Sequence, residues 1–255
     1  MNRNISDPVL RRVVETILRE VDPGFDFVDA GPIPWSAASP ESATAPVALV
    51  TTAGLHITGD RPFRSAEDPL GDPTFRVIPH GTSPFGLDLA QPYVDQRYIP
   101  RDPEVALPQA ALESLWESGL AGPPATRHIS FSGGLVRPLP GLDESARRVT
   151  EILGEDGVRA VVLVPSCPLC VQTVCLVARR IESAGIPTVC LTLVPELTGI
   201  VGAPRSLALK FPFGAPCGDP GNHALHRQVL EEALGLLHAA SAPGVVQQSR
   251  LAWRR

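Results

Sequence analysis

Cys167 and Cys170 are the residues of this sequence whose types and spacing best support chemistry. They form a Cys-Pro-Leu-Cys motif that follows the β-branched apolar run 158–165 and opens the amphipathic run 170–184. The first run is typical of a buried strand and the second of a helix. A thiol at such a junction faces the unpaired N–H groups of the first helical turn, which favour the thiolate over the thiol. The spacing puts both sulfurs on nearly the same face, so they can form a disulfide or bind one atom together, with Cys167 attacking and Cys170 resolving.

The residues alone leave three interpretations of this pair open. The pair could carry out redox or nucleophilic chemistry, pack as two small side chains at a tight turn, or bind a metal. A tetrahedral zinc site needs four ligands, and the sequence has no second CxxC motif, so Cys217 with His223 or His226 would have to complete it. We expect redox or nucleophilic chemistry with no bound cofactor and an external dithiol donor such as thioredoxin, with zinc as the alternative.

Further side chains could act as acids, bases or substrate ligands beside the thiols. The histidine candidates, each of which could equally be structural, are His56 at a strand end, His80 in a turn and His128 before a strand. Arg205 ends a short loop, where it could bind a substrate carboxylate or form a surface ion pair. Cys217 lies in a loop rich in Gly and Pro and is a candidate third thiol. We expect His223 and His226 to be solvated or capping side chains of a helix.

Short apolar strands alternate with longer helices along the chain. We expect strands at 46–56, 127–131, 158–165 and 187–194. We expect helices at 108–118, 143–153, 170–184 and 222–239, besides an N-terminal helix. Asp7 with Pro8 predicts the cap and first position of the N-terminal helix, and Asp143 predicts another cap. This alternation predicts an α/β fold with a doubly wound, mostly parallel sheet.

The chain is expected to form a single α/β domain with four parts. Residues 1–46 would form the N-terminal helix and a Pro-rich wrap, and residues 47–140 the first strand and long, functional Pro/Gly-rich loops. Residues 141–240 would form the CxxC-bearing βαβ half, and residues 241–255 a tail.

The composition excludes several functional classes. The 255 residues are 44% hydrophobic and 19% charged with a net charge of −5, which argues against disorder and against general nucleic-acid binding. No apolar run is long enough for a membrane span, and no Gly-rich loop ends in Lys-Ser or Lys-Thr, which excludes a P-loop NTPase. The amino terminus has no uninterrupted apolar region of a signal peptide, so we expect a cytoplasmic protein.

Several sequence segments resemble those of a known protein family. They are VPSCPLC (164–170), VTTAGLHITGDRPF (50–63), GDPTFRVIP (71–79), HISFSG (128–133) and GAPRSLALKFPFGAPCGDPG (202–221). Together they resemble, in the expected order, the selenoprotein B family of glycine, sarcosine, betaine and D-proline reductases, and most closely the D-proline reductase type. The chain would be a cysteine-containing form, because that family often carries selenocysteine at the position of Cys167.

The resemblance implies a reaction and partners. Cys167 would attack the substrate carbon that bears nitrogen and cleave the C–N bond, and Cys170 or a partner protein would release the adduct. The D-proline reductase type also implies a pyruvoyl-bearing partner subunit. Gln91 stands where the family leads us to expect His, whereas Asp95 matches. Because Gln cannot shuttle a proton, His80 would have to substitute or the acid–base step would differ.

From these observations we expect a thiol-dependent reductase of a small-molecule substrate, acting by reductive cleavage of a C–N or C–heteroatom bond. A partner reductase subunit or a homo-oligomer is expected, and no nucleic acid or membrane. Two alternatives stay open: a metal-binding protein that uses Cys167 and Cys170, and a non-catalytic partner subunit of a reductase complex.

Overall fold

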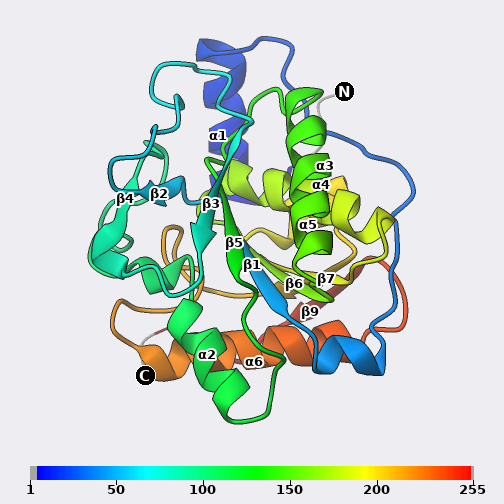
Figure 1. Cartoon of the computed structure of the whole chain (residues 1–255). Coiled ribbons are helices and arrows are strands. Elements are labelled where there is room, and N and C mark those ends of the chain that lie inside the picture. The colour runs from blue at the N-terminus through cyan, green and yellow to red at the C-terminus, as the bar shows by residue number, and fades with distance from the viewer. Residues whose placement is uncertain (1–4, 254–255) are drawn as a thin grey trace.

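A seven-stranded, mostly parallel sheet forms the centre of the protein, with helices on both faces (Figure 1). The computed structural model describes residues 5–253. In spatial order the strands are β3 (Phe75–Pro79), β5 (Arg127–Phe131), β1 (Val47–Thr51), β6 (Ala160–Val164), β7 (Thr188–Thr192), β8 (Arg205–Ala208) and β9 (Val245–Gln248). All neighbours pair in parallel except β3, which is antiparallel to β5. This arrangement confirms the predicted doubly wound α/β class.

Helices cover the two faces of the sheet unequally. The helices are α1 (Pro8–Glu20), α2 (Gln109–Glu117), α3 (Gly141–Glu155), α4 (Pro168–Ser183), α5 (Pro195–Val201) and α6 (His223–Ala239). α3, α4 and α5 pack together on one face, where α1 also contacts α4, and α2 packs against α6 on the other (Figure 1). Among the described residues, no helix is long and apolar enough to cross a membrane.

The order of the strands creates a crevice beside β1. The chain places β5 on one side of β1 and β6 on the other, and the intervening α3 lies on the opposite face from α2. Strand order therefore reverses at β1, and in open α/β sheets ligands bind at such a point, beyond the carboxyl ends of the strands. The residues that follow β1, β5 and β6 are thus brought together at one edge.

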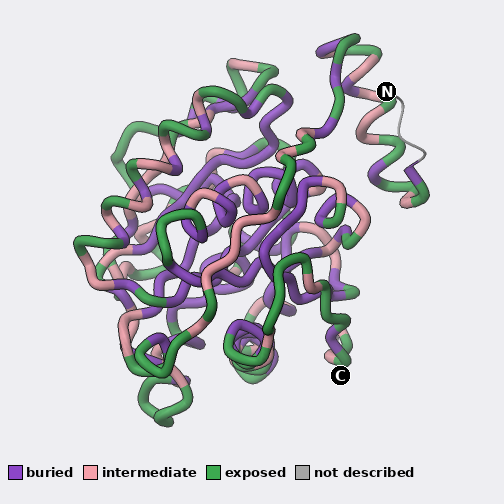
Figure 2. The backbone as a smooth tube through the Cα atoms, turned by 90° about the vertical axis from the view of Figure 1, so that its right-hand side faces the viewer, coloured by how far each residue is buried: buried purple, intermediate pink, exposed green. Residues whose placement is uncertain are grey.

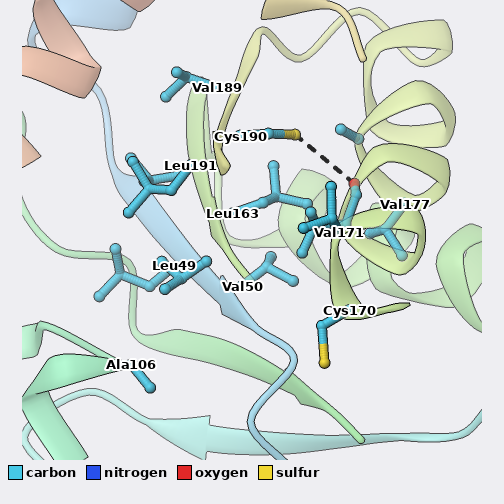
Figure 3. Close-up of a cluster of buried hydrophobic side chains, with 14 of the residues drawn as sticks. Leu49, Val50, Ala106, Leu163, Cys170, Val171, Val177, Val189, Cys190 and Leu191 are labelled. Carbon is cyan, nitrogen blue, oxygen red and sulfur yellow. Dashed lines mark hydrogen bonds between the residues drawn. The ribbon is translucent and has the colours of Figure 1, made fainter. Parts of the chain in front are cut away.

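Central strands are apolar because both faces are covered. Every residue of β1, β6 and β7 is buried, as expected for parallel strands between two helical layers. Figure 2 shows this buried backbone at the centre of the molecule, with exposed turns and helix faces around it. Figure 3 shows Leu49 and Val50 of β1, Leu163 of β6 and Val171 of α4 within the same hydrophobic cluster.

Several predicted boundaries need correction. The long loops expected within residues 47–140 also contain strands: β3, and β4 (Leu87–Leu89), which pairs with β2 (Leu55–Ile57). Segment 241–255 is not a simple tail, because it supplies β9. The sequence signal was weak because β3 and β9 are edge strands, whose residues are mostly half-buried or exposed. Short 3-10 helices also form at Pro40–Ala43, Pro84–Gly86 and Pro103–Val105.

The two predicted helix caps have different outcomes. The Asp7 carboxylate accepts hydrogen bonds from the backbone N–H groups of Val9 and Leu10, both at 2.9 Å, with Pro8 at the first helical position. Asp143 does not cap its helix, because α3 begins two residues earlier at Gly141. Asp143 instead lies in the first helical turn, where a carboxylate still interacts favourably with the helix dipole.

The Pro-rich segment before β1 wraps irregularly over the surface, as predicted (Figure 1, blue). Side chains of α4 fix its backbone: Gln172 Oε1 accepts from Val28 N at 2.9 Å, and an Arg179 guanidinium nitrogen donates to Ala30 O at 2.6 Å. At its far end the Trp35 ring lies 3.8 Å from the centre of the Arg205 guanidinium. The helix that carries the CxxC motif therefore also anchors the amino-terminal segment.

Candidate active site

Cys167 and Cys170 are joined in a disulfide at the turn from β6 into α4. Cys167 is the N-cap residue in an extended conformation, and the backbone N–H of Cys170 donates to Cys167 Sγ at 3.1 Å. Pro168 follows at the first helical position, where no N–H is required. The predicted meeting of the two sulfurs is confirmed. Cys167 is 2% exposed and Cys170 fully buried, so the first cysteine is the more accessible one only by a small margin.

The loops that follow β1 and β5 enclose Cys170. Its sulfur lies 3.6 Å from the carbonyl oxygen of Thr52, directly after β1. Gly133, after β5, has a φ of +63°, and a Cβ built on it would lie 2.7 Å from Cys170 Sγ. In Figure 3 the Cys170 sulfur points away from the hydrophobic cluster of α4, β6 and β7. The disulfide thus lies in the crevice that strand order predicts.

A cavity of about 670 Å³ lies beside Cys167. One wall is built from the start of α4 and the loops that approach it: Tyr93, Val94, Asp95, Gly134, Val136, Cys167, Pro168, Leu169 and Phe213. One side of α1 also lines the cavity, including Arg12, Val13, Thr16, Ile17 and Glu20. Cys167 is therefore not enclosed by hydrocarbon on every side, and a small ligand could meet its sulfur from this cavity.

Gln91 and Asp95 lie in the loop that forms part of this cavity. The buried Gln91 amide nitrogen donates to Ser132 O, and its oxygen accepts from Tyr93 N at 3.1 Å. Gln91 thereby ties its own loop to the segment that follows β5. Asp95 forms an ion pair with Arg97 at 2.6 Å, and hydrogen bonding to that guanidinium lowers the pKa of the Asp95 carboxyl. Asp95 is thus a carboxylate at neutral pH.

His80 and His128 form a separate hydrogen-bonded group. His128 Nδ1 accepts from Leu49 N at 3.1 Å, His128 Nε2 is 3.0 Å from His80 Nδ1, and His80 Nε2 is 2.9 Å from a Glu113 oxygen. Burial lowers the pKa of His128 to about 3, so this ring is neutral. Because Nδ1 is an acceptor, the network assigns the proton to Nε2, which donates to His80. His128 lies three residues before the end of β5, about 10 Å along the strand from the crevice.

The other sequence candidates lie apart from the cavity lining. His56 is buried in β2 and packs its ring against Phe63, and within the described structure its Nδ1 has no hydrogen-bond partner. Arg205 is neither in a loop nor on the surface: it lies in β8, is fully buried and pairs with Glu182 at 2.8 Å. Cys217 is buried, and desolvation raises the pKa of its thiol.

The described residues offer little support for a metal site. No group of three or more His, Cys, Asp or Glu side chains in the part of the chain that the structure describes could hold a metal ion. His226 was expected to be solvated or capping. It is instead buried, with its Nε2 2.9 Å from the Asp219 carbonyl oxygen, because α6 turns this face towards the loop before it.

Sequence reasoning missed the contribution of α1 to the site. The helix was expected from its periodicity, but nothing in that pattern indicates that Arg12 and Thr16 face the cavity beside Cys167. Thr52 and Phe213 were missed as well. The Gly-Gly pair at 133–134 was the available signal, because two consecutive glycines after a strand often mark a close approach of the backbone to another group.

Comparison with known proteins supports the family resemblance. No family model matches the chain. D-proline reductase subunit gamma of Acetoanaerobium sticklandii is 29% identical over 221 residues, covering 86% of this chain and 90% of that protein. Two proteins of Peptoclostridium acidaminophilum match at 28% and 27% identity over 84% of this chain: glycine reductase complex component B subunit gamma and sarcosine reductase complex component B subunit beta. The chain is homologous to these amino-acid reductase subunits.

The homologous subunits differ in length. The chain spans most of the D-proline reductase subunit but only 49% of the glycine and sarcosine reductase subunits. Among solved structures, a LacI-type transcription regulator of Bifidobacterium animalis subsp. lactis aligns with 97% of this chain and 64% of its own at 14% identity. The TM-score of 0.27 is too low for this likeness to inform the fold or the function of the chain.

Proposed function

We propose that this chain is the thiol-bearing subunit of a reductase that cleaves a C–N or C–heteroatom bond of a small substrate. The observation that carries the proposal is the Cys167–Cys170 disulfide, placed at the reversal of strand order beside a ligand-sized cavity. Homology to amino-acid reductase subunits supports the same reaction class. A partner subunit would supply groups that activate the substrate, as the names of the homologues refer to subunits and complexes.

The proposed reaction has two chemical steps. In the first, the Cys167 thiolate attacks the substrate carbon, an S–C bond forms, and the C–N electron pair leaves with the nitrogen, which takes up a proton as an amine. In the second, Cys170 attacks the Cys167 sulfur, an S–S bond forms, and the released carbon takes up a proton. The substrate gains two electrons, and the two thiols lose them to become the disulfide.

An external dithiol would then reduce the disulfide and complete the cycle. That donor's thiolate attacks one sulfur of the pair, and its second thiol resolves the mixed disulfide. The position of Cys167 at the N-terminus of α4 favours its thiolate, because the N–H groups of the first turn and the helix dipole stabilise negative charge there. We place this cycle in the cytoplasm, where thioredoxin-type donors keep dithiols available.

The proposal is tested by mass spectrometry and turnover of the intact protein with its co-purifying partners. Mild oxidation of the reduced protein should form the Cys167–Cys170 disulfide. D-proline, sarcosine, betaine and glycine serve as probe substrates, and the Cys170→Ser variant should accumulate a covalent adduct on Cys167 with whichever of them reacts. Cys217→Ser is the matched control, because that thiol is buried.

Two results together would refute the proposal. They are the absence of a Cys167–Cys170 disulfide after oxidation and unchanged dithiol-dependent turnover in the Cys167→Ser variant. Turnover that depends on a fixed partner but not on Cys167 would instead indicate a non-catalytic subunit.

A further inference from the structure

The cavity beside Cys167 is lined by one positive and two negative side chains, but both negative charges are paired with arginines outside the lining. Three lining residues are charged: Arg12, Glu20 and Asp95. Each carboxylate has a guanidinium of its own outside the lining, because Glu20 pairs with Arg19 and Asp95 pairs with Arg97, both at 2.6 Å. The positive charge of Arg12 is therefore the one left without a local counter-charge.

Arg12 has no such partner within residues 5–253. Among the described residues, no carboxylate or carbonyl oxygen accepts a hydrogen bond from its guanidinium, and its backbone carbonyl accepts from Thr16 Oγ1 at 2.9 Å within the helix. The side chain is exposed at the edge of α1, so it is hydrated and free to reorient. A guanidinium in this state binds a carboxylate through two parallel hydrogen bonds at little desolvation cost.

The start of α4, which lines the same cavity, also favours an anion. Cys167, Pro168 and Leu169 line it at the start of α4, a helix of 16 residues. The positive end of the helix dipole therefore lies at the lining of the same cavity as Arg12. The rest of the lining is largely apolar, including Val13, Val94 and Phe213.

We infer that Arg12 binds the anionic group of the ligand whose reacting carbon meets Cys167. That group would be a carboxylate, which all four probe substrates above carry, in a cavity of about 670 Å³. Helix α1 thus acts as the wall that determines specificity, while α4 carries the nucleophile. This inference rests on the proposed function, because it assumes that Cys167 reacts with ligands in this cavity.

Two alkylating reagents of nearly the same size test the inference without knowledge of the natural substrate. Iodoacetate is an anion and iodoacetamide is neutral, and both react with the Cys167 thiolate to form an S–C bond with loss of iodide. The rate of labelling at Cys167 is measured by peptide mass spectrometry on the reduced full-length protein. The ratio of the two rates cancels changes in thiolate population, because both reagents need the same thiolate.

The Arg12→Gln variant should lower the iodoacetate rate about 1.5- to fivefold relative to iodoacetamide, the range expected for an exposed ion pair. Arg12→Lys should restore most of the ratio. Arg11→Gln is the matched control on the same helix and should leave the ratio near the wild-type value, because Arg11 lies outside the cavity lining and donates to the carbonyl oxygen of Ile5 at 2.9 Å.

The outcomes separate this inference from the proposed function. An unchanged ratio in Arg12→Gln, or an equal change in Arg11→Gln, would overturn the role of Arg12 while leaving Cys167 chemistry intact. If neither reagent labelled Cys167 in the reduced wild-type protein, both the proposed function and the anion site would be wrong.

Discussion

The buried ion pair between Glu182 and Arg205 gives the sharpest test of how the amino-terminal segment is anchored. Both side chains are fully buried, and Arg205 donates to Glu182 at 2.8 Å. Glu182 also accepts from Thr188 N at 2.6 Å, and Arg205 donates to Ser36 O at 2.7 Å. The pair therefore joins the end of α4, strands β7 and β8 of the sheet, and the Pro-rich wrap.

Replacing Arg205 with Met should destabilise the protein far more than loss of a surface charge would. Burial raises the pKa of Glu182 and lowers the pKa of Arg205, so desolvation disfavours both charges. Removing one partner leaves the other buried without a counter-charge, which costs about 3–5 kcal/mol. That is a large part of the roughly 5–15 kcal/mol by which a domain is stable.

Urea unfolding followed by circular dichroism at pH 7 measures this loss. The control is Arg147→Met, because Arg147 forms exposed ion pairs with Glu144 and Glu151 on α3 and should change stability much less. The double variant Glu182→Gln with Arg205→Met should recover part of the loss. Equal effects of Arg205→Met and Arg147→Met would refute the reasoning.

The pH dependence of the Arg205→Met variant provides a second check. Without the guanidinium, the folded-state pKa of Glu182 rises further above its unfolded value of about 4.3. A carboxyl with a raised folded pKa contributes stability at low pH and loses it as the pH rises through that value. The deficit should therefore shrink when the pH is lowered from 7 towards 5. A deficit that is independent of pH would show that lost packing, and not a buried charge, causes it.

Two further predictions concern the strand β5 and the loop after it. Gly133→Ala should lower stability by roughly 1–3 kcal/mol, because its φ is positive and the new Cβ would meet the Cys170 sulfur, whereas Gly154→Ala, with open space around it, should not destabilise α3. Unfolding curves of both variants measure the contrast, and equal changes would contradict it. His128→Gln should remove acid sensitivity. The folded pKa of His128 is about 3, so its contribution is present above pH 6.5 and falls by about 2 kcal/mol between pH 7 and 5. Unfolding at both values should show that the variant loses less stability than the wild type, and parallel losses would be the contrary result.

The sequence predicted the local part of the site and could not predict its long-range part. The strand, the turn with Cys167 and Cys170, and the start of α4 are contiguous, so periodicity and composition identify all three. Arg205 shows the opposite case. Its strand, β8, has only four residues, and the Glu182 partner that makes its burial tolerable lies 23 residues earlier. No local pattern indicates such a pairing, which explains why a loop or surface position was expected.

The contact between His80 and His128 is another long-range feature that the sequence could not predict. His80 and His128 are 48 residues apart and meet only because β3 pairs antiparallel with β5. β3 was not predicted, since most of its residues are half-buried and the strand ends in Pro79. The contact between the two rings depends on that pairing and could not be expected from either residue alone.

The side chains in the crevice come from segments that are close together in the sequence and from others that are far apart. The disulfide comes from one turn, but the groups around it come from the ends of β1 and β5, from the loop held by Gln91, and from α1. A thiolate at the start of α4 would be stabilised by its own helix, whereas the ligand it meets would be selected by Arg12, 155 residues away in sequence. Because nucleophile and specificity lie on different elements, substitutions on the cavity face of α1 should change which ligands react without changing the intrinsic reactivity of Cys167. Neutral and anionic probes can separate these two properties, which a single activity measurement would combine.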